Sequence, residues 1–117
     1  MDEGFHRQLH EGREAFLRGE FFEAHEIWEA VWDEIDDPER RWIQGMIQIA
    51  TGLHKLSRGR SDVCRTLLEK ALAKLVDAPP TLEGLGLEGM REDARQVLLA
   101  IGRGEVPSPQ AVRLELA

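Results

Sequence analysis

The stretch from Gly19 to Ser57, GEFFEAHEIWEAVWDEIDDPERRWIQGMIQIATGLHKLS, decides the fold. Its apolar residues recur at helical spacing on both sides of Asp36-Asp37-Pro38, where aspartate and proline favour a turn. The spacing predicts one helix over residues 20–35 and another over residues 39–57. The second is apolar over so wide an arc that we expect it at the centre of the molecule.

The flanking sequence extends this pattern. Apolar stripes predict further helices over residues 5–18, 61–76 and 88–102, joined by short connections that favour antiparallel neighbours. Residues 81–89 hold three glycines and are expected to form a loop pinned by leucines, and residues 103–117 are expected to form an extended tail. No strand-like alternation appears. We therefore predict an all-α fold: a single-domain bundle of about five helices, built from antiparallel helical hairpins, over residues 1–117.

Composition narrows the function classes. The chain has 117 residues, 42% hydrophobic and 32% charged, and its single cysteine, Cys64, excludes an internal disulfide framework. No apolar run approaches the ~18 residues of a membrane span, and the N-terminus does not resemble a signal peptide, so we expect a cytoplasmic protein. The chain has no Tyr and no Asn, and the lack of Asn, a thermolabile amide, fits a heat-adapted source. A net charge of −7 argues against nucleic acid as a partner and leaves a small molecule, a cation or another protein.

The candidate site lies on the helix predicted over residues 20–35. His25 and Glu29 are four residues apart and therefore lie on one side of this helix. At 100° per residue, His25 lies about 60° and Glu29 about 100° from the centre of the apolar stripe, between Phe22 and Trp32. Ionisable groups at the border of a core are partly desolvated, and such groups can bind ligands or act as acid–base residues.

Two interpretations of this pair remain open. The pair could satisfy an edge histidine and lock its helix against a neighbour, as polar groups near a core are normally paired. Alternatively, His25 and Glu29 could bind a divalent transition metal such as Zn, Mn or Fe. A catalytic zinc site needs three protein ligands, and His54 is the natural third candidate. His54 lies beside Ile47, away from the polar edge that includes Gln48 and Lys55, where a histidine most often packs against a neighbouring helix.

For the other reactive side chains, we expect structural roles. His6 and His10 form a second pair four residues apart, which could face the neighbouring helix or water, and we expect a solvated pair. Cys64 lies on the apolar face of its predicted helix and is expected to be an inert core residue. His25-Glu26 opens the HExxH zinc-protease pattern, but position 29 is Glu instead of the second His.

The segment Phe22-x-Ala24-His25-Glu26-x-x-Glu29-x-x-Trp32, followed by Gln44-Gly45-Met46-Ile47-Gln48 and Leu53-His54, resembles a known family. This is the bacterial and archaeal family called domain of unknown function 309, marked by a His-x-x-x-Glu-x-x-Trp/Tyr motif. The resemblance spans roughly residues 5 to 75. It implies a small helical protein of unassigned function, with metal binding suggested for the motif and carried here onto His25 and Glu29.

Two functional hypotheses follow. In the first, the seam between the two central helices is a metal or small-ligand site: His25 and Glu29 bind or act as an acid–base pair, Glu26 is a nearby carboxylate, and Phe22 and Trp32 form the wall. In the second, the chain is a non-catalytic helical interaction module for another protein or its own copy, and the motif is a structural clamp. The sequence assigns no reaction, and no membrane partner is expected.

Overall fold

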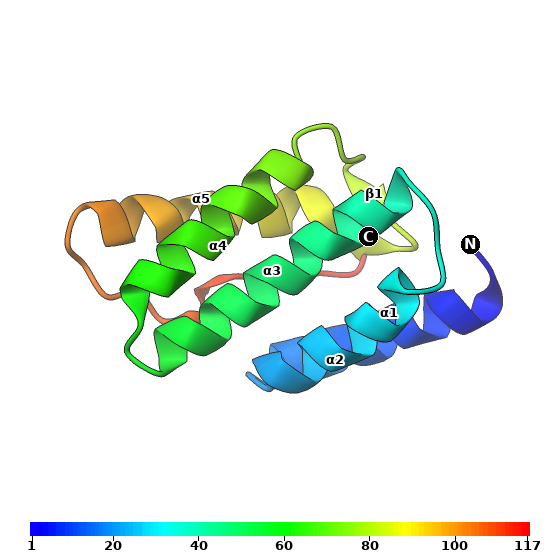
Figure 1. The fold of residues 1–117 in the computed structure, drawn as a ribbon, viewed down its shortest axis with the longest axis horizontal. Helices are drawn as coiled ribbons and strands as arrows, with labels where there is room; N and C mark the ends of the chain where they lie inside the picture. Colours follow the sequence, from blue (N-terminus) through cyan, green and yellow to red (C-terminus); the bar gives the residue numbers. More distant parts are fainter.

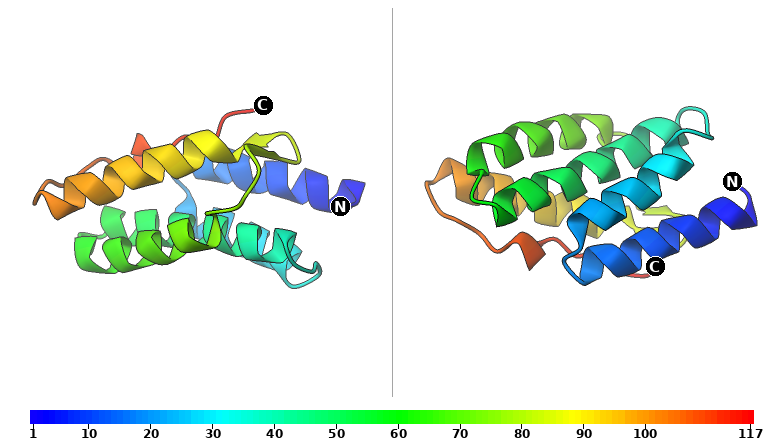
Figure 2. Two further views of the ribbon diagram at one scale, coloured as in Figure 1. Left: turned by 90° about the horizontal axis from the view of Figure 1, so that it is seen from above. Right: turned by 60° about the horizontal axis from the view of Figure 1, so that its bottom comes forward.

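The structure, a computed structural model, describes all 117 residues and confirms the all-α bundle. Five helices form two layers (Figures 1 and 2): α2, α3 and α4 lie side by side in one, and α1, α5 and the C-terminal segment cover the other side. The helices are α1 (Glu3–Leu17), α2 (Phe21–Trp32), α3 (Glu39–Ser57), α4 (Ser61–Lys74) and α5 (Leu87–Gly102).

The ends of the helices differ from the predicted ones for local reasons. The first helix begins earlier, at Glu3, because the Asp2 carboxylate accepts a hydrogen bond from the Phe5 backbone N–H and caps it. It ends before Gly19, whose φ of +78° is a conformation that favours glycine. The second helix stops at Trp32 instead of Ile35, and the third spans the predicted residues 39–57.

The segment expected to be a loop contains a small β-hairpin. Strands β1 (Thr81–Leu82) and β2 (Leu85–Gly86) pair antiparallel, and Leu82, Leu85 and Leu87 are buried, as expected of residues that pin the segment. The extended tail is also docked. After a 3₁₀ turn at Pro109–Ala111, Val112 and Leu114 are buried and Leu116 bridges to Leu85. Its backbone satisfies the free edge of β2, since Gly86 N–H donates to the Glu115 carbonyl.

Helix α3 is central, as its wide apolar arc predicts. Nine of its 19 residues are buried, and it packs against α2 on one side and α4 on the other. Gly45 allows the close approach of α4, because a Cβ atom there would lie 2.7 Å from Leu75 Cγ. None of the helices is long and apolar enough to cross a membrane.

The interface between α1 and α2 is built around one tryptophan. Trp28 is fully buried, and its indole N–H donates a hydrogen bond of 3.1 Å to the Leu9 carbonyl oxygen. Gly12 makes room for the ring, since a Cβ there would lie 2.1 Å from Trp28 Nε1. Phe16 packs on the same indole with ring centroids 5.7 Å apart. This side of α2 is therefore both closely packed and satisfied in its hydrogen bonds.

Candidate functional site

The His25–Glu29 pair forms as predicted. His25 Nε2 lies 2.8 Å from a Glu29 carboxylate oxygen, one turn further along α2. The side chain of His25 is 26% exposed, whereas that of Glu29 is 51% exposed, so the pair lies at the border between core and solvent. Both residues belong to α2, so this contact orients the imidazole but does not link α2 to another helix.

Two recesses meet at His25. The first, of about 270 Å³, is an open groove on α2 lined by Phe22, His25, Glu26, Glu29, Ala30 and Asp33. The second, of about 120 Å³, lies between α2 and α3 and is lined by Phe22, His25, Thr51, His54 and Lys55. Phe22 stands between them, with its ring centroid 5.7 Å from that of His25 and 5.8 Å from that of His54. The groove on α2 is predominantly acidic, whereas the second recess has no carboxylate in its lining.

The contact line between α2 and α3, which we call the α2–α3 seam, holds all the buried side-chain polar atoms that lack a hydrogen-bond partner in the chain. They are His25 Nδ1 and Trp32 Nε1 on α2, and Gln48 Oε1 on α3. Gln48 lies three residues before Thr51 and seven before Lys55, on the stripe of α3 that lines the second recess. A buried polar group without a partner costs about 1–3 kcal/mol, so three such groups on two helices need a physical reason.

Trp32 lies apart from the two recesses. The Arg40 guanidinium stacks on its ring, with the guanidinium carbon 3.8 Å from the ring centroid, and Arg40 Nε donates to the Trp32 carbonyl oxygen. Trp32 thus covers the end of the α2–α3 seam nearest the loop between these helices. It lines neither the groove on α2 nor the second recess, so its expected role as a wall stays a prediction.

His54 reaches the seam, but not as part of a three-residue metal cluster. It shares the second recess with His25 and Phe22. The structure contains no group of three or more His, Cys, Asp or Glu side chains placed to hold a metal ion. The metal hypothesis therefore has two adjacent donors, His25 and Glu29, and His54 stays a predicted third ligand.

The sequence reasoning missed three residues of α3: Gln48, Thr51 and Lys55. Their spacing of three and four residues marks a polar stripe along a helix of which about half is buried, which was the available signal. The interpretation that His54 lies away from Lys55 differs from the structure, where both line the second recess. Consecutive residues on a helix diverge by 100°, but both of these side chains are long enough to reach the same seam.

The other histidine pair and the cysteine have structural roles. His6 and His10 stack with ring centroids 4.3 Å apart, and both contact Glu83 of the hairpin, so the expected solvated pair is wrong for His10. His10 Nε2 donates to the Glu83 carbonyl oxygen at 2.7 Å. Cys64 is fully buried, and desolvation raises the pKa of its thiol to about 11, which suits an inert core residue.

Comparison with known proteins supports the resemblance. Residues 9–67 match the family model described as "Domain of unknown function (DUF309)". An uncharacterised protein of Aquifex aeolicus (strain VF5) is 28% identical over 109 residues, which cover 92% of this chain and 32% of that protein. The chain thus spans about a third of the length of this relative. The family match covers α2, α3 and both recesses, and it ends before the hairpin, α5 and the tail. The chain belongs to the DUF309 family.

Proposed function

We propose that this protein binds a small polar ligand at the α2–α3 seam, beside the His25–Glu29 pair. The observation that carries the proposal is that three buried polar atoms without partners all lie on the two helices of this seam. Buried polar groups in native proteins are paired with protein, ordered water or ligand. His25 also lines both recesses, so a ligand seated there lies against the α2 side chain whose buried Nδ1 has no partner in the chain.

The chemistry of the pair follows from its geometry. Because Glu29 lies against Nε2 of His25, the imidazole nitrogen directed away from the carboxylate is Nδ1, which is the buried nitrogen without a partner. In neutral histidine, one ring nitrogen donates and the other accepts. With its N–H toward Glu29, His25 keeps an acceptor at the buried Nδ1, and Gln48 keeps a second at Oε1; a ligand bonds either atom when the side chains of the seam move apart. The site therefore suits a ligand carrying hydroxyl or amine donors, and His25 is placed to accept a proton from it.

A metal ion is a less favoured ligand of this site than a small polar molecule. Two donors from one helix turn leave at least one protein ligand to be supplied, and a catalytic zinc centre normally has three. We therefore expect that Zn²⁺, Mn²⁺ or Fe²⁺ added in modest excess leaves the melting temperature of the protein unchanged. A metal-dependent rise in melting temperature that disappears in both His25→Ala and His54→Ala would replace the ligand proposal with the metal hypothesis.

The experiment uses isotope-labelled protein and side-chain nuclear magnetic resonance. Acetamide, glycerol and methylammonium are titrated while the ring signals of His25 and the side-chain amide of Gln48 are recorded. At least one probe is expected to shift both sets of signals saturably, and its affinity is expected to fall at least tenfold in His25→Phe. His6→Phe, which alters the exposed member of the other pair, is the matched control and should bind as the wild type does.

Either of two results would overturn the proposal. In the first, neither these uncharged or cationic probes nor small anions shift the seam signals of the wild type. In the second, the probes bind equally well to His25→Phe and Gln48→Met, which would place their binding elsewhere on the surface.

A further inference from the structure

The second recess differs in charge from the rest of this acidic protein. The chain carries a net charge of −7, and the groove on α2 next to the recess is lined by Glu26, Glu29 and Asp33. In contrast, the recess between α2 and α3 is lined by one lysine, two histidines, a threonine and a phenylalanine. The His25 imidazole divides the two environments, with Nε2 at the Glu29 carboxylate.

Lys55, His54 and Thr51 of this recess each keep a polar side-chain group free to bind a ligand. Lys55 takes part in none of the eleven ion pairs of the chain, although its side chain is only partly exposed. The His54 ring makes no side-chain hydrogen bond, since only its backbone carbonyl is engaged, by Ser57. Thr51 donates its hydroxyl hydrogen to the Ile47 carbonyl oxygen, which leaves its oxygen as an acceptor. Lys55 and His54 therefore line a recess that has no carboxylate in its lining.

From this arrangement we infer that the ligand carries an anionic group, a carboxylate or a phosphate, which binds between Lys55, His54 and Phe22. This inference rests on the proposed function and specifies the class of its ligand. The recess of about 120 Å³ holds several times the ~30 Å³ that one water occupies in the liquid, so a small polyatomic anion fits. Lys55 supplies a compact positive charge with three donors, and His54 supplies an N–H.

The same arrangement orients the rest of the ligand. With its anionic group at Lys55, a short ligand that carries an adjacent hydroxyl places that hydroxyl beside the His25 side chain. The ring of Phe22, 55% exposed and in contact with both histidines, covers the junction between the recess and the acidic groove. The carboxylates of that groove repel a second anionic group, so a ligand with a single anionic end is preferred. A small hydroxy acid or a phosphate monoester has this pattern.

The test titrates labelled protein with acetate, glycolate and inorganic phosphate, each against chloride at equal ionic strength and constant pH. We expect saturable shifts of the His25, His54 and Thr51 signals with at least one of these anions and none with chloride. The two anion classes are separated by their relative affinities. Glycolate is expected to bind more tightly than acetate, and this gain should disappear in His25→Phe because the hydroxyl then loses its polar neighbour.

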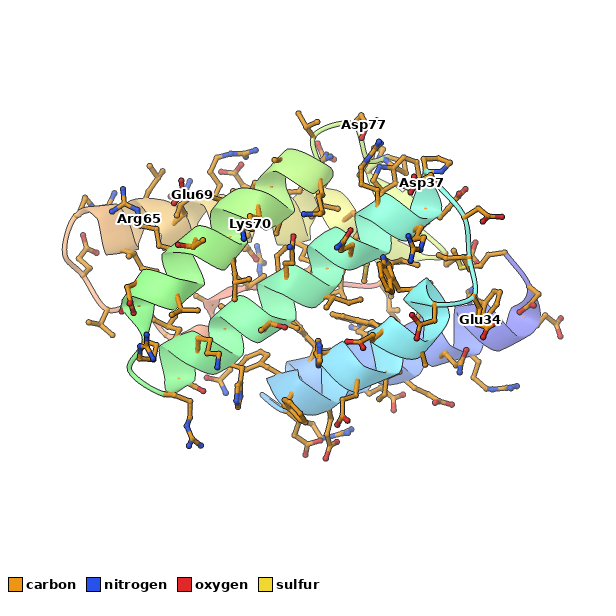
Figure 3. The ribbon with its side chains drawn as sticks, viewed as in Figure 1. Glu34, Asp37, Arg65, Glu69, Lys70 and Asp77 are labelled. Atoms are coloured by element: carbon orange, nitrogen blue, oxygen red, sulfur yellow. The ribbon has the colours of Figure 1, made fainter.

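Lysine variants test the charge directly. Lys55→Gln should weaken anion binding at least tenfold, whereas Lys55→Arg, which keeps the charge, should retain most of it. Lys70→Gln removes an exposed lysine from α4, which Figure 3 shows with α3 lying between it and α2, and should bind as the wild type does. Unchanged amide spectra of the ligand-free variants verify that each is folded.

The outcomes separate this inference from the proposed function. If acetamide, glycerol or methylammonium binds at the seam but no anion does, or if Lys55→Gln binds anions as well as the wild type, the anionic ligand class is wrong and the seam site stands. If no probe of either kind shifts the signals of His25 or Gln48, both proposals fail.

Discussion

The two faces of α2 solve the same packing problem in different ways. Toward α1, the indole N–H of Trp28 is bonded to the Leu9 carbonyl and its ring fills the space above Gly12. Toward α3, the indole N–H of Trp32 is buried without a partner, as are His25 Nδ1 and Gln48 Oε1. One helix therefore has a face whose buried indole is paired within the chain and a face on which two buried nitrogens are not. Departures of this kind from local consistency concentrate at functional sites.

Gly12→Ala should lower the free energy of unfolding most, because it disturbs the packing between α1 and α2. The new Cβ would lie 2.1 Å from Trp28 Nε1, so the indole must move and lose its bond to Leu9. We expect a loss of about 2–3 kcal/mol in the free energy of unfolding, even after the better helix propensity of alanine. Urea denaturation measures this. The matched control is Gly89→Ala in α5, where nothing lies within 4 Å and stability should stay equal or rise; equal losses in the two variants would disprove the packing argument.

The two tryptophans allow the faces to be compared with the same substitution. Trp28→Phe removes the indole hydrogen bond to the Leu9 carbonyl and leaves unfilled space in the core, so a loss of roughly 2 kcal/mol is expected. Trp32→Phe removes an N–H that has no partner and weakens only the stacking of Arg40, so about 0.5 kcal/mol or less is expected. Chemical denaturation of both variants tests the difference, and a larger loss for Trp32→Phe would reverse the comparison.

The histidine pair on α1 provides a structural counterpart to His25. His10→Ala removes a hydrogen bond to the Glu83 carbonyl, and we expect it to lower the free energy of unfolding by about 1 kcal/mol. His6→Ala removes a half-exposed contact to the Glu83 side chain and should cost less than ~0.5 kcal/mol. Thermal and urea unfolding of both variants provide the measurement. If the two losses were the same, His10 would not anchor the hairpin.

The rate at which Cys64 is labelled gives a second measure of the difference between the two faces of α2. Its thiol is fully buried and its pKa of about 11 leaves little thiolate at neutral pH, so labelling by a thiol reagent requires opening of the fold. At pH 8 the wild type should label far more slowly than unfolded protein. Labelling should accelerate in Gly12→Ala and stay at the wild-type rate in Trp32→Phe. Fast labelling of the native wild type would contradict the inert role of this residue.

The sequence predicted the parts of the molecule that depend on one helix. The apolar stripes placed all five helices, because burial of one face imposes the helical period. For the same reason, helix geometry was enough to bring Phe22, His25, Glu26 and Glu29 to one groove. The hairpin at residues 81–86 was missed, because strands of two residues each cannot show an alternating pattern.

Features that depend on how two helices pack against each other could not be predicted from the helical period of the sequence. Thr51 and Lys55 meet His25 because of the register between α2 and α3, and a helical period does not encode that register. The docking of the tail was missed for a related reason. Its prolines indicate extended chain, but burial of Val112 and Leu114 depends on where α1, α5 and the hairpin leave apolar surface uncovered.

We propose that the polar groups of the α2–α3 seam are retained for a ligand and not for stability. The most direct measurement is the free energy of unfolding of Gln48→Met, which keeps the length of the side chain and removes the unpaired amide oxygen. Without ligand, this variant should be as stable as the wild type or more stable. A loss of about 1 kcal/mol or more would show that the Gln48 amide stabilises the fold and is not kept for a ligand.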